Sequence, residues 1–226
     1  MIFIVDFDGT ISTKDTVDEA LEAFGVDKEE IARIEDAWVQ GRIGSKECLS
    51  EQFKQTRLTP DEFLNFARSV QIDPAFKDFY KAASKNHEVY IVSDGLDALI
   101  GEVFKLNGLS DVKFFANHVV WEKQSRISLQ FPFSQATCAQ QSGVCKCAVA
   151  QQQRGEDASK IVMIGDGRSD FCVAGMADMV FAKKSLKKHC VEKNIPHIAY
   201  ETFAEINDYF GFPNSQPVQK PFERVA

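Results

Sequence analysis

Residues 2–10 read IFIVDFDGT. The run Ile2–Val5 within this stretch is apolar, unbroken and rich in β-branched residues, which is the pattern of a strand buried on both faces of a parallel sheet. Similar strands are expected at Glu88–Val92 and Lys160–Ile164, and each is followed by a polar turn that contains glycine. Strands that end in this way predict an α/β fold with its ligand site at the carboxyl ends of the strands.

Helical periodicity replaces the strand pattern between Thr13 and about Asn86. Asp27 with Glu30, and Thr59-Pro60-Asp61-Glu62, have the pattern of capping boxes, and Asp73-Pro74 is expected to begin a helix in the same way. We therefore predict a core of residues 1–12 and 73–212 and a small helical-bundle cap, residues 13–72, inserted after the first strand. Residues 213–226 form a proline-containing tail that is expected to be mobile or draped over the surface.

The second half of the chain continues the alternation of helices and strands. Phe114–Phe133 is expected to form one core strand followed by a hairpin near residues 117–133, and Met179–Ala182 a short last strand. The expected helices are Leu96–Asn107, Lys146–Arg154, Phe171–Met176, and two capped terminal helices, at Ser185–Lys193 and from Thr202 onward.

The composition excludes several classes of protein. Hydrophobic residues make up 44% and charged residues 26% of the 226 residues, which excludes a disordered or collagen-like chain. The net charge of −7 disfavours nucleic acid and anionic membrane surfaces as partners, but not a small anion held by a few local groups. Six sparse cysteines and the lack of a long apolar run favour a cytoplasmic protein. We expect a monomer or a homodimer.

The first candidate site is the pair Asp6 and Asp8. Alternate residues of a strand face the same side, so both carboxylates can point into one pocket, where their repulsion favours a cation or a shared proton. One carboxylate can attack phosphorus while its neighbour gives and then takes a proton. In isolation, an Asp-x-Asp pattern is more often only the turn that ends a strand.

Three further signals follow in the chain. Ser93 comes after a predicted strand, where its hydroxyl and nearby N–H groups favour an oxyanion, although a serine there is usually only a helix cap. Lys146 begins a predicted helix and could bring its charge to a phosphate, although a solvated lysine is the simpler interpretation. Gly165–Asp170, which reads GDGRSD, carries two carboxylates that suit a hard cation. All four signals are much less expected to occur together by chance than any one of them alone. Together they predict a single site.

These motifs resemble those of the haloacid-dehalogenase superfamily of phosphatases. Asp6–Thr10 matches its first motif, Ser93 the second, Lys146 the third and Gly165–Asp170 the fourth. The resemblance implies a Rossmann-like parallel sheet with a helical cap inserted just after the first motif. It also implies a Mg²⁺-dependent phosphatase for a small phosphomonoester, working through an aspartyl phosphate.

The resemblance also implies a role for each matched residue. Asp6 would be the nucleophile and Asp8 the general acid and base. The Mg²⁺ ligands would be Asp6, the backbone carbonyl of Asp8, and Asp166, supported by Asp170 and Thr10. The phosphate would be held by Ser93, Asp94, Gly95 and Lys146.

Within the superfamily the chain resembles the phosphoserine-phosphatase-like group, and in that group most closely the methionine-salvage phosphatases, which act on 2-hydroxy-3-keto-5-methylthiopentenyl 1-phosphate. The features that carry this likeness are Ser93–Asp97, Ala116–His118, Phe131-Pro132, Cys138–Lys146, Ala177-Asp178 and Phe181-Ala182. Phosphoserine phosphatases usually have glycine at the position of Asp94, whereas phosphocholine and phosphoethanolamine phosphatases share the aspartate. These three substrates are therefore the alternatives.

Several residues have two interpretations of different kinds. Asp94 could contact the substrate or merely cap the following helix, and the sequence favours neither interpretation over the other. Cys138, Cys145 and Cys147, with His118, could suggest zinc, but their spacing lacks a second tight pair and is more typical of free thiols. Trp38, Arg42 and Arg57 could face a substrate or belong to ordinary packing and a solvated face.

Two rival functions come from other classes. A phosphoacceptor signalling domain also gathers carboxylates, a hydroxyl and a lysine around Mg²⁺, but it places its acids on different strands and has no inserted cap. A non-catalytic binder of phosphorylated ligands is the second rival, and the intact motifs disfavour it.

Overall fold

The computed structural model describes residues 1–156, 159–216 and 224–225. Its centre is a sheet with the strand order β4-β3-β2-β1-β5-β6-β7-β8. The strands are β1 (Ile2–Val5), β2 (Glu88–Leu96), β3 (Lys113–Glu122), β4 (Arg126–Gln130), β5 (Ile161–Gly165), β6 (Met179–Ala182), β7 (His197–Ala199) and β8 (Arg224–Val225). All neighbouring pairs from β3 to β7 are parallel, as the strand pattern predicts.

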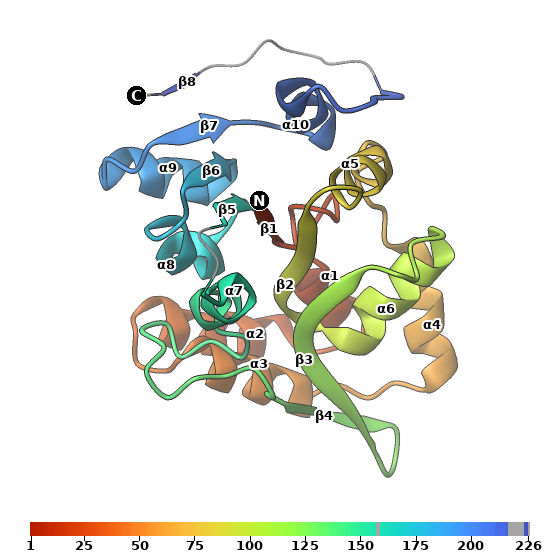
Figure 1. The fold of residues 1–226 in the computed structure, drawn as a ribbon. Coiled ribbons are helices and arrows are strands. Elements are labelled where there is room, and N and C mark those ends of the chain that lie inside the picture. Colours follow the sequence, from red (N-terminus) through yellow and green to blue (C-terminus); the bar gives the residue numbers. More distant parts are fainter. Residues whose placement is uncertain (157–158, 217–223, 226) are drawn as a thin grey trace.

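Helices cover both faces of the sheet (Figure 1). Alternate residues of β1 serve the two layers, since Phe3 and Val5 belong to one apolar cluster and Ile2 and Ile4 to the other. The first cluster packs under α5 (Phe76–Ala83), α6 (Asp97–Leu106) and α10 (Phe203–Phe210), and the second under α7 (Lys146–Arg154), α8 (Phe171–Ala174) and α9 (Lys184–Glu192). Burial on both faces explains why β1 is apolar throughout.

Four helices lie between β1 and α5 and sit at one end of the sheet (Figure 1). They are α1 (Thr16–Ala23), α2 (Lys28–Val39), α3 (Ser45–Lys54) and α4 (Pro60–Ser69). The chain leaves and re-enters the core at neighbouring points, because Ser12 and Ile72 form a β-bridge and the Asp73 N–H donates to the Ile11 carbonyl at 2.8 Å. A core of residues 1–12 and 73–212 and a cap of residues 13–72 remain our proposal for the domain boundaries.

The N-termini of the helices show which of the predicted capping boxes form. Thr59 and Glu62 form a reciprocal capping box. Asp27 accepts from the Glu29 and Glu30 N–H groups, but the Glu30 carboxylate pairs with Arg33 and does not return to the cap. The box predicted there is therefore only half made.

The prediction that Asp73-Pro74 begins a helix in the same way is wrong. α5 begins at Phe76 after Ala75, without a side-chain cap. The Asp73 carboxylate instead accepts from the Ala75 N–H at 2.9 Å and from the Phe203 N–H at 2.8 Å, so it ties the start of α10 to the turn before α5.

The terminal helices also differ from the prediction. α9 starts at Lys184 and α10 at Phe203, and neither has a side-chain cap hydrogen bond. At the start of α10, the Glu205 carboxylate accepts from the Glu201 N–H at 2.7 Å instead.

The strand boundaries differ at three places. β2 continues through Ser93 to Leu96, with a register shift after Val92. β3 is one long strand that pairs with β2 at its start and forms the β4 hairpin at its end, where we expected a strand and a separate hairpin. β6 is not the last strand, because the short strands β7 and β8 follow it. Part of the predicted tail, residues 217–223 and 226, lies outside the described residues.

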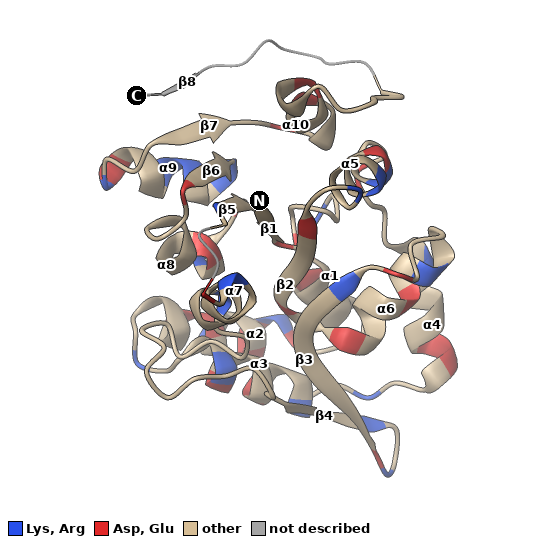
Figure 2. Ribbon diagram, viewed as in Figure 1, with Lys and Arg blue, Asp and Glu red and all other residues tan. Residues whose placement is uncertain are grey.

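Several helices, among them α5 and α6, carry both acidic and basic residues (Figure 2). Among the described residues, no helix combines the length and the apolar character needed to cross a bilayer. The cytoplasmic location and the monomeric or dimeric state remain predictions.

Candidate active site

The four sequence motifs meet at the carboxyl ends of β1, β2 and β5. The register pairs Val5 with both Ile91 and Ile164, so the residues that follow these positions emerge at one edge of the sheet. Ser93 Oγ lies 3.0 Å from Asp8 Oδ2, and Lys146 Nζ lies 2.5 Å from Asp6 Oδ1. The structure therefore brings together side chains that are far apart in the chain, such as Asp6 and Lys146, which are separated by 140 residues.

Lys146 is buried between two carboxylates. Its Nζ contacts Asp6 Oδ1 at 2.5 Å and Asp170 Oδ1 at 2.6 Å. Burial alone would lower the pKa of Lys146, but the charges of Asp170 and Asp6 raise it above its ordinary value, so the ammonium stays protonated. The sequence could not distinguish this lysine from a solvated one, whereas the structure buries it.

Replacing Lys146 by methionine should strongly destabilise the fold. The variant leaves Asp6 and Asp170 as buried carboxylates without their ammonium, a change that typically costs about 3–5 kcal/mol. Burial then raises the pKa of both carboxyls above the value in the unfolded chain, so the deficit relative to the parent should shrink as the pH falls from about 7.5 to about 5.

Urea unfolding in EDTA measures this difference at both pH values. Lys113→Met is the matched control, because Lys113 pairs with Glu88 on the surface and should change stability by less than about 1 kcal/mol. Equal stabilities for the Lys146 and Lys113 variants would contradict a buried charge centre.

Asp6, Asp166 and Asp170 each offer one carboxylate oxygen to a cluster in which these three atoms lie within 4.8 Å of one another. Both Asp170 oxygens are already engaged, one by Lys146 and the other by the Asp166 and Gly167 N–H groups. Asp6, which Lys146 contacts through Oδ1 alone, therefore keeps more freedom to bind a cation than Asp170 does. Hard carboxylate oxygens are the donors that Mg²⁺ prefers, so the residues present fit this ion.

Asp166 is held from two sides. Thr10 Oγ1 donates to its Oδ1 at 3.4 Å, and Lys184 Nζ lies 2.9 Å from its Oδ2. Gly9, at the turn after β1, has φ +67° and packs so closely on Asp166 that a Cβ would collide with the carboxylate. Glycine is required there for both reasons.

Asp8 lies beside Asp6 in a different environment. The N–H and hydroxyl of Thr16 donate to its Oδ1, and Ser93 donates to its Oδ2. Burial, followed by the neighbouring charge of Asp15, raises the pKa of Asp8 to about 6. A carboxyl with this pKa can release and accept protons near neutral pH.

Asp94 does not cap α6, which is preceded by Leu96 and lacks a side-chain cap. Its Oδ1 accepts from the Val144 N–H at 2.7 Å and its Oδ2 from the Ser45 hydroxyl at 3.1 Å, so the carboxylate joins α3 to the loop before Lys146. The Gly95 N–H donates to Ser93 Oγ at 2.8 Å. Phosphate contacts by Ser93, Asp94 and Gly95 remain predictions.

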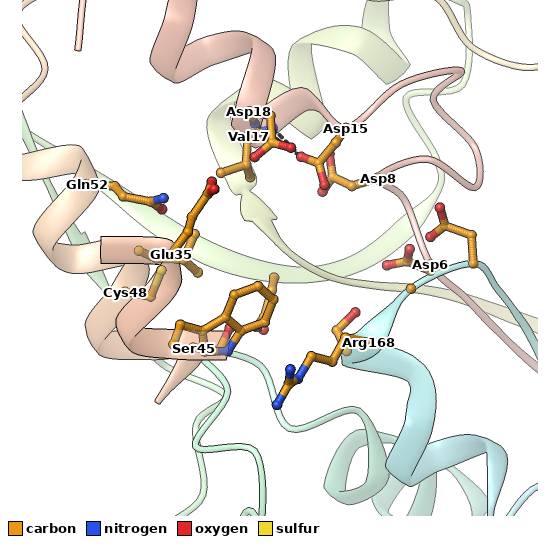
Figure 3. Close-up of a pocket in the computed structure, with 16 residues that line it drawn as sticks. Asp6, Asp8, Asp15, Val17, Asp18, Glu35, Ser45, Cys48, Gln52 and Arg168 are labelled. Carbon is orange, nitrogen blue, oxygen red and sulfur yellow. Dashed lines mark hydrogen bonds between the residues drawn. The ribbon is translucent and has the colours of Figure 1, made fainter. Parts of the chain in front are cut away.

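A cavity of about 170 Å³ opens above these groups, between the core and the inserted helices α1, α2 and α3 (Figure 3). Asp15 and Asp18 lie beside Asp8, whereas Glu35 and Cys48 come from α2 and α3 (Figure 3). The lining residues are Asp6, Asp8, Asp15, Val17, Asp18, Glu35, Trp38, Ser45, Cys48, Leu49, Gln52, Asp94, Asp166, Gly167, Arg168 and Ser169.

Of the three cap residues considered from sequence, Trp38 lines this cavity. Arg42 pairs with Asp36 at the surface, and Arg57 lines a different depression near Phe24 and Leu58.

Sequence reasoning missed several residues of the site, of which Lys184, Thr16 and Asp15 are the clearest. Lys184 follows the parallel strand β6, and that position near a strand end is the signal that could have identified it. Asp15 caps α1, and this local role already explains an aspartate at that position, so the sequence gives no sign that Asp15 also lines the cavity.

All six cysteines are free thiols. Cys138 and Cys145 are in side-chain contact, but His118 pairs with Asp97 at 2.6 Å. Within the described ranges, the group of possible metal ligands is the aspartate cluster. That the cysteines bind no zinc remains a prediction.

Comparisons with known proteins agree with this geometry. The family model of haloacid dehalogenase-like hydrolases matches residues 3–175. The 2-hydroxy-3-keto-5-methylthiopentenyl-1-phosphate phosphatase of Geobacillus thermodenitrificans is 28% identical over 217 residues, which cover 92% of this chain and 94% of that protein. Pdp3-interacting factor 1 of Schizosaccharomyces pombe is 26% identical, over 89% of this chain and 91% of that protein.

Among solved structures, a phospho-aspartyl intermediate analogue of phosphoserine phosphatase superimposes with a TM-score of 0.69 at 18% identity, covering 92% of this chain and 97% of that one. This likeness confirms the predicted Rossmann-like fold. Because the family model spans most of the chain and its motifs meet at one site, the chain belongs to the haloacid dehalogenase-like hydrolase family.

Proposed function

We propose that this hydrolase is a Mg²⁺-dependent phosphatase that cleaves a small phosphomonoester through an aspartyl phosphate on Asp6. The observation that carries the proposal is the pairing of two different carboxyls in one cavity. Asp6 lies against a buried ammonium and two further acids, while Asp8 lies outside that charge cluster with a pKa of about 6. Carboxyls in contrasting environments suit a nucleophile and a proton donor.

The chemistry divides between these two residues. The free oxygen of Asp6 attacks phosphorus, and Asp8 gives its proton to the departing alkoxide oxygen, so the alcohol leaves neutral. Asp8 then takes a proton from water as the water attacks the phosphoryl group, which releases phosphate and restores Asp6. Lys146 holds Asp6 in position and offsets charge on the phosphoryl oxygens. A bound Mg²⁺ would neutralise further charge on those oxygens, held by Asp6, Asp166 and the backbone carbonyl of Asp8.

We propose 2-hydroxy-3-keto-5-methylthiopentenyl 1-phosphate as the substrate. Several relatives that match about nine-tenths of the chain carry the name of this phosphatase. The cavity also supports the assignment, because Val17, Trp38 and Leu49 offer apolar surface that suits a methylthioalkyl chain.

A second candidate is a phosphomonoester that carries an amine, namely phosphoserine, phosphocholine or phosphoethanolamine. The observation that favours it is the acidic wall formed by Asp15, Asp18 and Glu35. Carboxylates that line a cavity suit a cationic group of the ligand. Comparing kcat/KM for the methionine-salvage intermediate with that for these three compounds tests the choice.

Hydrolysis of p-nitrophenyl phosphate with Mg²⁺ tests the proposed function itself. Turnover with release of inorganic phosphate supports a phosphatase. Binding of phosphorylated ligands without turnover would instead indicate the non-catalytic alternative, and a stable phosphoprotein would indicate a phosphoacceptor domain.

Asp166→Ala should abolish measurable Mg²⁺ binding. The variant removes a carboxylate that belongs to the oxygen cluster and leaves Lys184 without its partner. Titration calorimetry with MgCl₂ measures the loss directly. Asp208→Ala, at an exposed position of α10, is the control and should bind like the parent. Equal Mg²⁺ affinity in the two variants would refute the metal assignment.

A further inference from the structure

Arg168 occupies an unusual position for a basic residue. It lies in the turn after β5, between Asp166 and Asp170, and its side chain lines the cavity (Figure 3). Within the described part of the chain, it is the single arginine or lysine among the lining residues, which include many carboxylates. Arg168 is therefore a cationic group in the cavity lining that is available to a ligand.

The Arg168 guanidinium is held by an aromatic ring and not by an acid. Its central carbon lies 5.2 Å from the ring centroid of Trp38, on the inserted helix α2. Across the described residues, its side chain makes no hydrogen bond or ion pair with another side chain. The contact with the ring restrains the guanidinium and leaves its N–H groups available to a ligand.

A guanidinium oriented in this way recognises two oxygens that lie in one plane, because its N–H donors form a rigid fork. A carboxylate has such a pair of oxygens, and so does a carbonyl with a hydroxyl on the neighbouring carbon. A simple amine or alkyl group has neither. The acidic wall of Asp15, Asp18 and Glu35 cannot serve this purpose, since carboxylates repel such oxygens.

We propose that Arg168, positioned by Trp38, determines specificity by binding a planar pair of oxygens in the leaving group of the phosphomonoester. This inference rests on the proposed phosphatase function. It predicts that a carboxylate or a hydroxy-ketone next to the phosphate-bearing carbon improves binding. The contact also joins core and cap, because Arg168 belongs to the core and Trp38 to α2. The position of α2 over the cavity therefore affects the position of the residue that binds the leaving group.

Two matched pairs of compounds test the proposal. Phosphoserine differs from phosphoethanolamine by one carboxylate, and dihydroxyacetone phosphate differs from glycerol 1-phosphate by a planar carbonyl. The affinity of each compound is measured as its inhibition constant in the hydrolysis of p-nitrophenyl phosphate. This measurement also includes compounds that bind without being hydrolysed. In at least one pair, the parent protein should bind the compound with the planar oxygens more tightly than its partner compound. The pair in which this occurs identifies whether a carboxylate or a hydroxy-ketone supplies the oxygens.

In Arg168→Met, which keeps the apolar stem, that preference should fall by about tenfold to a hundredfold, the range for a hydrogen bond to a charged group. Arg168→Lys should restore only part of it, because an ammonium lacks the fork. Trp38→Leu should weaken the preference. Arg168→Met should then reduce the preference less in the Trp38→Leu background than it does in the parent, because the two residues act together. Arg42→Met, which lies outside the cavity, is the control and should keep the full preference.

Three results would overturn the proposal. They are no preference within either pair in the parent, an equal loss for both members of a pair in Arg168→Met, and full rescue by lysine. An equal loss would show that the contact with Trp38 only supports the cap. Failure of the parent to hydrolyse p-nitrophenyl phosphate would refute the proposed function instead, so the two failures are distinguishable.

Discussion

Asp6→Asn should lose hydrolysis of every phosphomonoester, by on the order of 10⁴-fold or more in kcat. An amide is a poor nucleophile and a poor ligand for a hard cation, so the variant loses both the covalent step and part of the metal site. Because Lys146 keeps its contact with Asp170, the variant should still fold. The large effect is therefore expected without loss of the structure.

Steady-state assays with p-nitrophenyl phosphate, together with acid-quench trapping of phosphoprotein, measure this effect. The parent should yield a phosphorylated chain after rapid quenching, and Asp6→Asn should yield none. Asp208→Asn serves as the control for a lost carboxylate at an exposed position. Phosphoprotein that persists in Asp6→Asn would place the nucleophile elsewhere.

Asp8→Asn should separate the two halves of the reaction. Asparagine keeps the shape of the side chain and the backbone carbonyl but can neither donate the proton nor accept it. Hydrolysis of unactivated alkyl phosphates should therefore fall by about two to four orders of magnitude, the usual contribution of a general acid or base. An aryl phosphate needs little help with its leaving group, so its first step should suffer less and the phosphorylated form of Asp6 should accumulate.

Rapid-quench kinetics with p-nitrophenyl phosphate should then show a burst of nitrophenol followed by slow turnover. The natural control is Thr16→Val, which removes a hydroxyl donor to Asp8 but leaves its carboxyl in place. That variant should keep measurable turnover of alkyl phosphates. Equal losses for alkyl and aryl substrates in Asp8→Asn, with no trapped phosphoenzyme, would restrict Asp8 to a structural or metal-binding role.

Much of the sheet and the order of the site motifs follow from local sequence. The apolar run Ile2–Val5 has the length and composition of a strand buried on both faces, and α7 occupies the predicted range Lys146–Arg154. The box at Thr59 and Glu62 forms as predicted because both partners lie within one helical turn. β7 was missed because three residues are too few to show an alternating pattern.

The sequence by itself determined the features that depend on neighbours in the chain. These are the type of most elements and the paired carboxylates Asp6 and Asp8 at one strand end. Each depends on backbone geometry over a few residues, so a short pattern contains the necessary information.

Only the tertiary structure decided which partner each polar group takes. Asp73 and Asp94 could each have capped the next helix, but they accept from Phe203 and Val144 instead, across 130 and 50 residues. In the same way, Lys184 reaches Asp166, and Arg168 stacks on Trp38 from the inserted helices. A buried polar group must find a partner wherever packing places one, and packing joins segments whose proximity no local pattern records.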